Sequence, residues 1–209
     1  MHYGNQDLFN VISNFVPSKF FQDTLAALHT SHKDACIHVE KHFSQPEAKD
    51  LLPHYRRALI EDKMRDIARA NGFSAAPVLN KTKNASHTEI EVEINSNRVI
   101  FTTLSVQNRY DLTKLRKAQF RKTLAETEPW LFNELKGLND GFYGVILYGA
   151  NAESKDVVDF AVLAFPSSNC QTWFGHYDLF KLAGDPMKAE FIEDMADPKL
   201  RKDIIRKEI

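Results

Sequence analysis

One seven-residue stretch constrains the fold of this chain more than any other. Acidic and apolar side chains alternate over residues 88–94, which places three glutamates opposite three aliphatic residues: Glu89, Glu91 and Glu93 against Ile90, Val92 and Ile94. Such alternation is typical of a strand with one buried and one solvated face. Turn residues follow at 95–97, and then a β-branched run over 98–106. We therefore predict a β-hairpin over residues 88–106, with its aliphatic side chains buried and its glutamates facing solvent or a cavity.

The residues before the hairpin have the patterning of helices. Apolar residues recur at helical spacing before Pro17, and a second such pattern covers residues 18–43. Prolines suit the first turn of a helix, so we predict a short helix near 46–52 and a longer one over 54–70. Asn71-Gly72, which tolerates a left-handed backbone, should end the longer helix.

The rest of the chain adds one helix and several strands. An extended stretch near residues 77–79 predicts a strand before the hairpin, and a helix should run from Asp111 to about residue 127. The later elements follow in order: strands at 142–148, 157–165 and 173–180, then two short helices that start near Pro186 and Pro198.

This order of elements indicates an α+β fold, because the strands come in runs rather than in strict alternation with helices. We expect a helical N-terminal region over residues 1–53, followed by a core over residues 54–209 in which helices pack on a mixed or antiparallel sheet. No low-complexity linker separates the two regions, so they can form one continuous domain.

Composition excludes several classes of protein. Hydrophobic residues make up 43% of the chain and charged residues 26%, as in an average globular protein and unlike a disordered one. The longest apolar run is Phe160–Phe165, far short of the ~20 residues that span a membrane. Two cysteines form neither a disulfide framework nor a four-cysteine zinc site, and no secretory signal is evident. We expect a cytoplasmic protein in which Cys36 and Cys170 are reduced.

The order helix, hairpin, helix, strand over residues 54–150 resembles the core of the restriction-endonuclease-like phosphodiesterases. In that family, a carboxylate on one strand and an acid-x-lysine motif on the next bind a divalent metal that activates water. The resemblance assigns the first carboxylate to Glu89, Glu91 or Glu93, with Glu61 contributed by the preceding helix. The next strand, residues 99–107, contains neither an acid nor a lysine. The resemblance therefore implies a degenerate site, and glutamates on a solvated face are the alternative explanation.

A cluster of histidines has the composition of a zinc site but not its geometry. Five potential ligands occur within 14 residues: His29, His32, Cys36, His38 and His42. At ~100° per residue, the first three lie on one side of a helix and the last two nearly opposite. We predict no metal site, since ordinary histidines explain the cluster better.

The remaining motifs for catalysis or cofactor binding are weaker. Cys170, His176 and Asp178 include the residue types of a catalytic triad, but on one strand Cys170 and His176 would lie ~20 Å apart. The glycines do not spell a phosphate-binding loop, and no Gly-Lys-Ser/Thr sequence occurs. We therefore predict no cofactor, and the catalytic residues, if any, stay unidentified.

Charge is distributed unevenly beneath the net value of −1. Residues 54–137 carry 15 Lys+Arg against 10 Asp+Glu, while both ends of the chain are acidic. Within 109–122, six basic residues accompany a single acid, Asp111: Arg109, Lys114, Arg116, Lys117, Arg121 and Lys122. On one helix Lys114, Lys117 and Arg121 would lie within ~60° of one another. Such a stripe can follow a phosphate backbone, and a solvated helix face is the alternative.

These observations favour a non-catalytic protein that binds nucleic acid or an acidic protein partner through the basic helix. Two alternatives belong to other classes. One is a metal-dependent phosphodiesterase with a degenerate site, and the other is an assembly subunit whose acidic C-terminal helices bind a basic partner. No motif for reading bases accompanies the basic residues. The sequence leaves the oligomeric state open.

Overall fold

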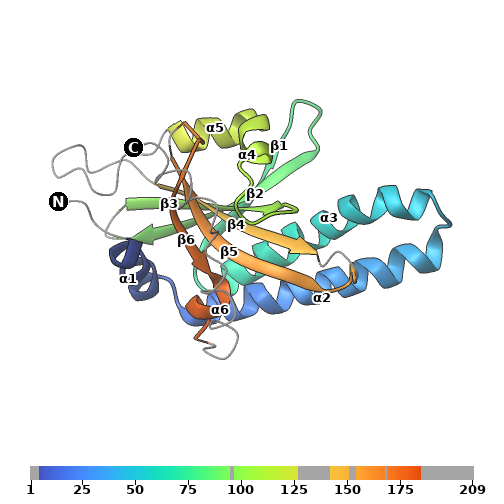
Figure 1. The fold of residues 1–209 in the computed structure, drawn as a ribbon, viewed down its shortest axis with the longest axis horizontal. Helices are drawn as coiled ribbons and strands as arrows, with labels where there is room; N and C mark the ends of the chain where they lie inside the picture. The colour runs from blue at the N-terminus through green and yellow to red at the C-terminus, as the bar shows by residue number, and fades with distance from the viewer. Residues whose placement is uncertain (1–4, 95–96, 127–141, 151–153, 168, 185–209) are drawn as a thin grey trace, which may run out of the picture.

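The computed structural model of the chain (Figure 1) contains a six-stranded mixed sheet and six helices among the residues that it describes. These residues are 5–94, 97–126, 142–150, 154–167 and 169–184. The α+β class predicted from the sequence is confirmed.

The elements follow the predicted order. The helices are α1 (Asn5–Phe15), α2 (Ser18–His42), α3 (Glu47–Ala70), α4 (Thr113–Lys117), α5 (Gln119–Glu126) and α6 (Leu179–Leu182). The strands are β1 (Ser74–Leu79), β2 (Ala85–Ile94), β3 (Asn97–Ser105), β4 (Phe142–Ala150), β5 (Val158–Pro166) and β6 (Trp173–Asp178). The two helices predicted after Pro186 and Pro198 lie outside the described residues.

The strands lie in the sheet in the same order as in the sequence, from β1 to β6. Neighbouring strands are antiparallel except β3 and β4, which are parallel from the pair Val99–Phe142 to the pair Ser105–Tyr148. A parallel pair requires a crossover connection, and α4 and α5 lie on it. This crossover positions the basic segment beside the carboxyl end of β3.

The predicted hairpin is confirmed as β2 and β3. Ile90 pairs with Phe101 and Val92 with Val99, and the alternating aliphatic residues are at most 1% exposed. Glu91 and Glu93 are exposed, while Glu89 is half-buried. The alternation therefore predicted the buried face correctly, because α1 and α3 pack on that side of β2.

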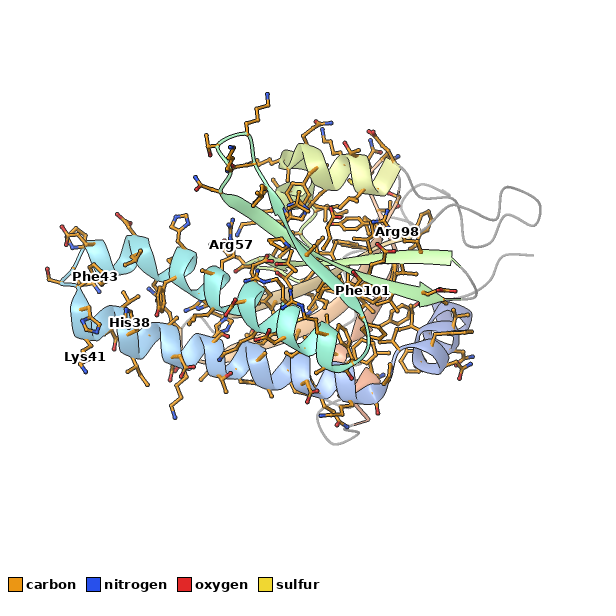
Figure 2. The ribbon with its side chains drawn as sticks, turned by 180° about the vertical axis from the view of Figure 1, so that it is seen from behind. His38, Lys41, Phe43, Arg57, Arg98 and Phe101 are labelled. Atoms are coloured by element: carbon orange, nitrogen blue, oxygen red, sulfur yellow. The ribbon has the colours of Figure 1, made fainter. Side chains whose placement is uncertain are left out.

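Helices cover both faces of the sheet. One face packs against α1, α2, α3 and α6. The core between this face and the helices includes the rings of Phe20 from α2 and Phe101 from β3, and Figure 2 labels Phe101 within it. The opposite face packs against α4 and α5 through Leu115 and Ala125. The boundary expected between residues 53 and 54 lies inside α3, a helix that contributes to the first core.

One helix replaces the two that were predicted around Pro53. α3 is continuous from Glu47 to Ala70 with Pro53 inside it, so the prediction of a break there was wrong. A proline in the second turn removes one backbone hydrogen bond, and the packing of α3 along α2 offsets that loss. Gly72 ends the segment with φ +81°, the left-handed backbone expected of it. α2 and α3 together form a helical hairpin that projects beyond the sheet (Figure 1).

Candidate nucleic-acid interface

The basic segment folds as two helices instead of the single helix predicted over residues 111–127. The chain leaves the helical conformation at Ala118, which has ψ 109°. The cause is the apolar pattern: nine residues apart, Leu115 and Leu124 would lie on opposite sides of a continuous helix at ~100° per residue. The break lets both leucines pack in the same core against the sheet. The expected stripe of Lys114, Lys117 and Arg121 along one helix is therefore wrong.

The break divides the six predicted basic residues into two groups. Lys114, Arg116 and Lys117 belong to α4, and all three are exposed. Arg109, Arg121 and Lys122 are partly buried. The α4 group is thus the fully exposed one, and we call these three residues the α4 cations.

The α4 cations have a fixed base and, among the described residues, no ion-pair partner. Leu115 is fully buried between them, and Lys114 Nζ donates to the carbonyl of Ser105 at 2.8 Å. Within the part of the chain that the structure describes, none of the three forms an ion pair. The nearest acid in the sequence is Asp111, whose Oδ1 accepts the Thr113 N–H at 2.8 Å. The hydrogen bonds from Thr113, then the charges of Arg116 and Lys114, lower the pKa of Asp111.

Two of the other predicted basic residues pack against aromatic rings. The guanidinium of Arg121 lies 4.4 Å from the centre of the Phe120 ring, and its Nη2 donates to the carbonyl of Thr103 at 3.1 Å. The guanidinium of Arg109 lies 5.6 Å from the centre of the Phe160 ring. These side chains hold the segment on the sheet.

A buried carboxylate bonds β2 and β3 together where their pairing stops. The register of the two strands ends at Ile90 and Phe101. Beyond it, Glu61 Oε2 accepts the backbone N–H of Thr88 at 2.6 Å and Oε1 accepts the hydroxyl of Thr103 at 3.0 Å. Glu61 is only 8% exposed. Since Arg121 bonds to Thr103 from the opposite face, a carboxylate and a guanidinium together satisfy backbone groups at this divergence.

The ring of His87 connects this divergence to α5. His87 stacks on Phe120 with ring centres 3.7 Å apart and planes at 12°. Its Nε2 lies 3.1 Å from Glu89 Oε1, which can only accept. Burial lowers the pKa of His87, against the opposing effect of Glu89, so the ring is neutral near pH 7. The base of β2 is thereby fixed to α5.

The carboxylates that the nuclease resemblance singled out do not converge as metal ligands. Glu61 is occupied by its two donors, Glu89 pairs with His87, and Glu91 Oε2 pairs with Arg98 Nε at 2.7 Å; Figure 2 labels Arg98 at the far end of the hairpin. Among the described residues, no three His, Cys, Asp or Glu side chains are grouped so that they could hold a metal ion. The strand β3 also contains neither an acid nor a lysine.

The five potential zinc ligands are divided as the helical geometry predicts. His38 stacks on Tyr55 at 4.6 Å between ring centres, and His42 lies next to it at 4.5 Å, both near the tip of the α2–α3 hairpin (Figure 2). His32 is fully buried on the other side of α2, with Nδ1 donating to the carbonyl of Leu28 at 2.8 Å. Burial, followed by the charge of Arg56, lowers the pKa of His32 to about 4.

The residues of the supposed triad have separate structural roles. Cys170 is buried in a turn with φ +54°. His176 Nε2 is hydrogen bonded to the carbonyl of Arg109 at 3.0 Å, while Asp178 Oδ1 accepts the Phe180 N–H at 2.6 Å and so begins α6. The strand predicted to reach residue 180 therefore ends at Asp178. Cys36 is also buried, and the two cysteines are not joined to each other.

Sequence reasoning missed two further exposed cations outside the basic segment. Lys81 and Lys83 lie in the turn between β1 and β2 and are both exposed. In Figure 1 this turn lies at the top of the view together with α4 and α5. Its sequence signal is the symmetric Asn80-Lys-Thr-Lys-Asn84, which has turn residues at each end.

Comparisons with known proteins add no identification. No family model, no curated protein and no solved structure matches this chain. In the described part of the chain, no helix combines the length and the apolar character needed to cross a bilayer.

Proposed function

We propose that this protein is a cytoplasmic, non-catalytic nucleic-acid-binding protein and that the α4 cations are its phosphate contacts. One observation supports the proposal most: Lys114, Arg116 and Lys117 crowd into a five-residue helix, are all exposed, and form no ion pair within the described residues. Unpaired cations at this density attract polyanions and release counterions when they bind.

The way in which α4 is anchored to the core also supports binding to nucleic acid. Leu115 anchors the helix in the core, and the Lys114–Ser105 hydrogen bond ties it to the end of β3. A rigid base lowers the entropy lost when the cations engage a phosphate backbone. The contacts carry no sequence information by themselves, so we expect binding with little preference for particular bases.

Catalysis at Glu61 is the less favoured function. Its carboxylate already accepts two hydrogen bonds from β2 and β3, and the adjacent strand contributes no second acid and no lysine. A metal-dependent phosphodiesterase needs several free oxygen ligands around its ions. The geometry therefore supports a structural role for Glu61 within a binding protein.

The test is titration of fluorescent DNA and RNA with the wild-type protein and two matched variants over a salt series. One variant, K114A/R116A/K117A, removes the α4 cations. The control, K33A/K41A/K49A, removes three exposed lysines from the α2–α3 hairpin. On duplex DNA we expect the log–log salt slope of the first variant to fall by about 0.9 for each lost contact, and that of the control to stay unchanged.

Two results would overturn the proposal. The first is a wild-type protein that binds neither DNA nor RNA at low salt. The second is equal loss of affinity in both variants, which would mean that net charge and not α4 governs binding. Binding to an acidic protein in place of nucleic acid would redirect the proposal to that class of partner.

A further inference from the structure

The turn between β1 and β2 forms a second basic projection, which we call the lysine arm and define as residues 77–87. It carries Lys81 and Lys83, and no aspartate or glutamate occurs anywhere between Asp66 and Glu89. Both lysines are exposed and neither pairs with an acid among the described residues. The arm is therefore a separate site of positive charge, far along the sequence from α4.

The tip of the lysine arm is rigidly built. Asn80 Oδ1 accepts the N–H groups of Thr82 at 2.9 Å and Asn84 at 3.0 Å, and also the Thr82 hydroxyl at 2.7 Å. The backbones of Asn80 and Asn84 close the turn, since Asn80 N–H donates to the Asn84 carbonyl at 2.8 Å. Lys83 adopts φ +62° within it. The two lysines thus project from an ordered turn.

The base of the arm is fixed relative to the basic helices. Thr88 of β2 is hydrogen bonded to two α3 side chains: its N–H donates to Glu61 Oε2, and its Oγ1 accepts from Arg65 Nη1 at 3.1 Å. His87 stacks on Phe120 of α5. Because α5 follows α4 directly, the His87–Phe120 stacking ties the base of the arm to the segment that carries the α4 cations, and Figure 1 shows the β1–β2 turn, α4 and α5 together at the top of the view.

We infer that the lysine arm is a second nucleic-acid contact and that, with α4, it selects double-stranded DNA; this inference rests on the proposed function. Two rigid basic elements from different parts of the fold suit the two backbones that border one groove. The major groove of B-form DNA is about 12 Å wide and admits a two-stranded β-ribbon. The deep, narrow major groove of duplex RNA does not.

The aromatic residues near the arm favour a duplex over a single strand. Proteins that bind single strands offer open aromatic faces on which bases stack. Beside the arm, Phe120 is covered by His87 on one side and contacts the guanidinium of Arg121. Tyr110, the exposed aromatic residue nearest to α4 in the described sequence, stacks on His176 at 4.7 Å between ring centres. These rings are engaged with other side chains of the protein.

The test uses the full chain carrying K81A/K83A, a charge-matched control K41A/K49A, and the charge-preserving variant K81R/K83R. The probes are a labelled 20-base-pair DNA duplex, one of its strands alone, and an RNA duplex of the same sequence. We expect K81A/K83A to weaken binding to the DNA duplex about tenfold and to lower its salt slope by roughly 1.8, with the arginine variant and the control close to wild type. Circular dichroism checks that each variant is folded.

The outcomes separate the two proposals. If the wild type binds DNA through α4 and K81A/K83A binds like the control, the arm has no role and this inference fails while the proposed function stands. If the single strand or the RNA duplex binds as tightly as the DNA duplex, the assignment to double-stranded DNA is overturned. If the wild type binds no nucleic acid, both proposals fail.

Discussion

α4 and α5 both carry basic residues, three in the five residues of α4 and two in the eight of α5, yet the two helices use them in different ways. The cations of α4 are exposed and unpaired within the described residues, whereas Arg121 of α5 is packed on Phe120 and bonded to the sheet. The difference arises from the break at Ala118, which turns each helix so that its leucine faces the core. A run of positive charge is thus no measure of a binding surface until the apolar residues between the charges are placed.

The largest expected effect concerns Glu61, whose carboxylate bonds to the same residue of β3, Thr103, as Arg121 of α5. Replacing Glu61 with alanine leaves the Thr88 N–H and the Thr103 hydroxyl without their buried acceptor. At 1–3 kcal/mol for each unsatisfied group, we expect the free energy of unfolding to fall by about 3 kcal/mol. Urea denaturation measures it, with E93A as the matched control on the exposed face of β2. Equal stability of the two variants would show that Glu61 has no structural role.

The direct comparison of the two helices should give a smaller effect. R121A removes the bond to the Thr103 carbonyl and the contact with Phe120, so we expect a loss of about 1–2 kcal/mol. R116A removes a solvated charge on α4 and should cost less than ~0.5 kcal/mol. R121K keeps the charge without the planar guanidinium and should restore little of the stability. Equal losses in R121A and R116A would contradict the division of roles between α5 and α4.

The smallest expected effect is the pH dependence that His87, which stacks on Phe120 of α5, gives to the free energy of unfolding. Burial lowers the pKa of His87 below its usual 6.5, so the unfolded chain binds this proton at a pH where the folded chain does not. Stability contributed by the neutral ring is present above pH 6.5 and is lost as the pH falls below it. We expect H87F, which keeps an aromatic ring on Phe120, to lose less stability between pH 7 and pH 5 than the wild type. The pKa values of His32 and His176 are also lowered by burial, but these residues contribute equally to both proteins. An unchanged decline in H87F would therefore be evidence against the prediction.

Local sequence patterns predicted an element correctly where its structure depends on one buried face or on the local backbone. The alternation at residues 88–94 identified the buried side of β2 because a single layer of helices covers it. Gly72 ended α3 as expected because only the local backbone was involved. The break at Ala118 was missed because the sequence places Leu115 and Leu124 on opposite sides of a continuous helix without showing that both pack in the same core against the sheet.

The candidate site was predicted in part. Residues 109–122 were identified by their charge. That Lys114 and Arg121 lie on two different helices is visible only in the structure. Glu61 was singled out as a metal ligand because its position before the hairpin fits the nuclease resemblance, whereas in the structure its oxygens bond to β2 and β3. Lys81 and Lys83 were overlooked because two lysines in a turn are ordinary until the turn is seen beside α4.

The most direct test of the account is the salt dependence of DNA-duplex binding in K114A/R116A/K117A compared with R121K, both measured on folded protein. The account predicts that the log–log slope falls by roughly 2.7 in the α4 variant, at about 0.9 per phosphate contact, and stays near the wild-type value in R121K. A slope that is unchanged in the α4 variant, or that falls as far in R121K, would contradict it.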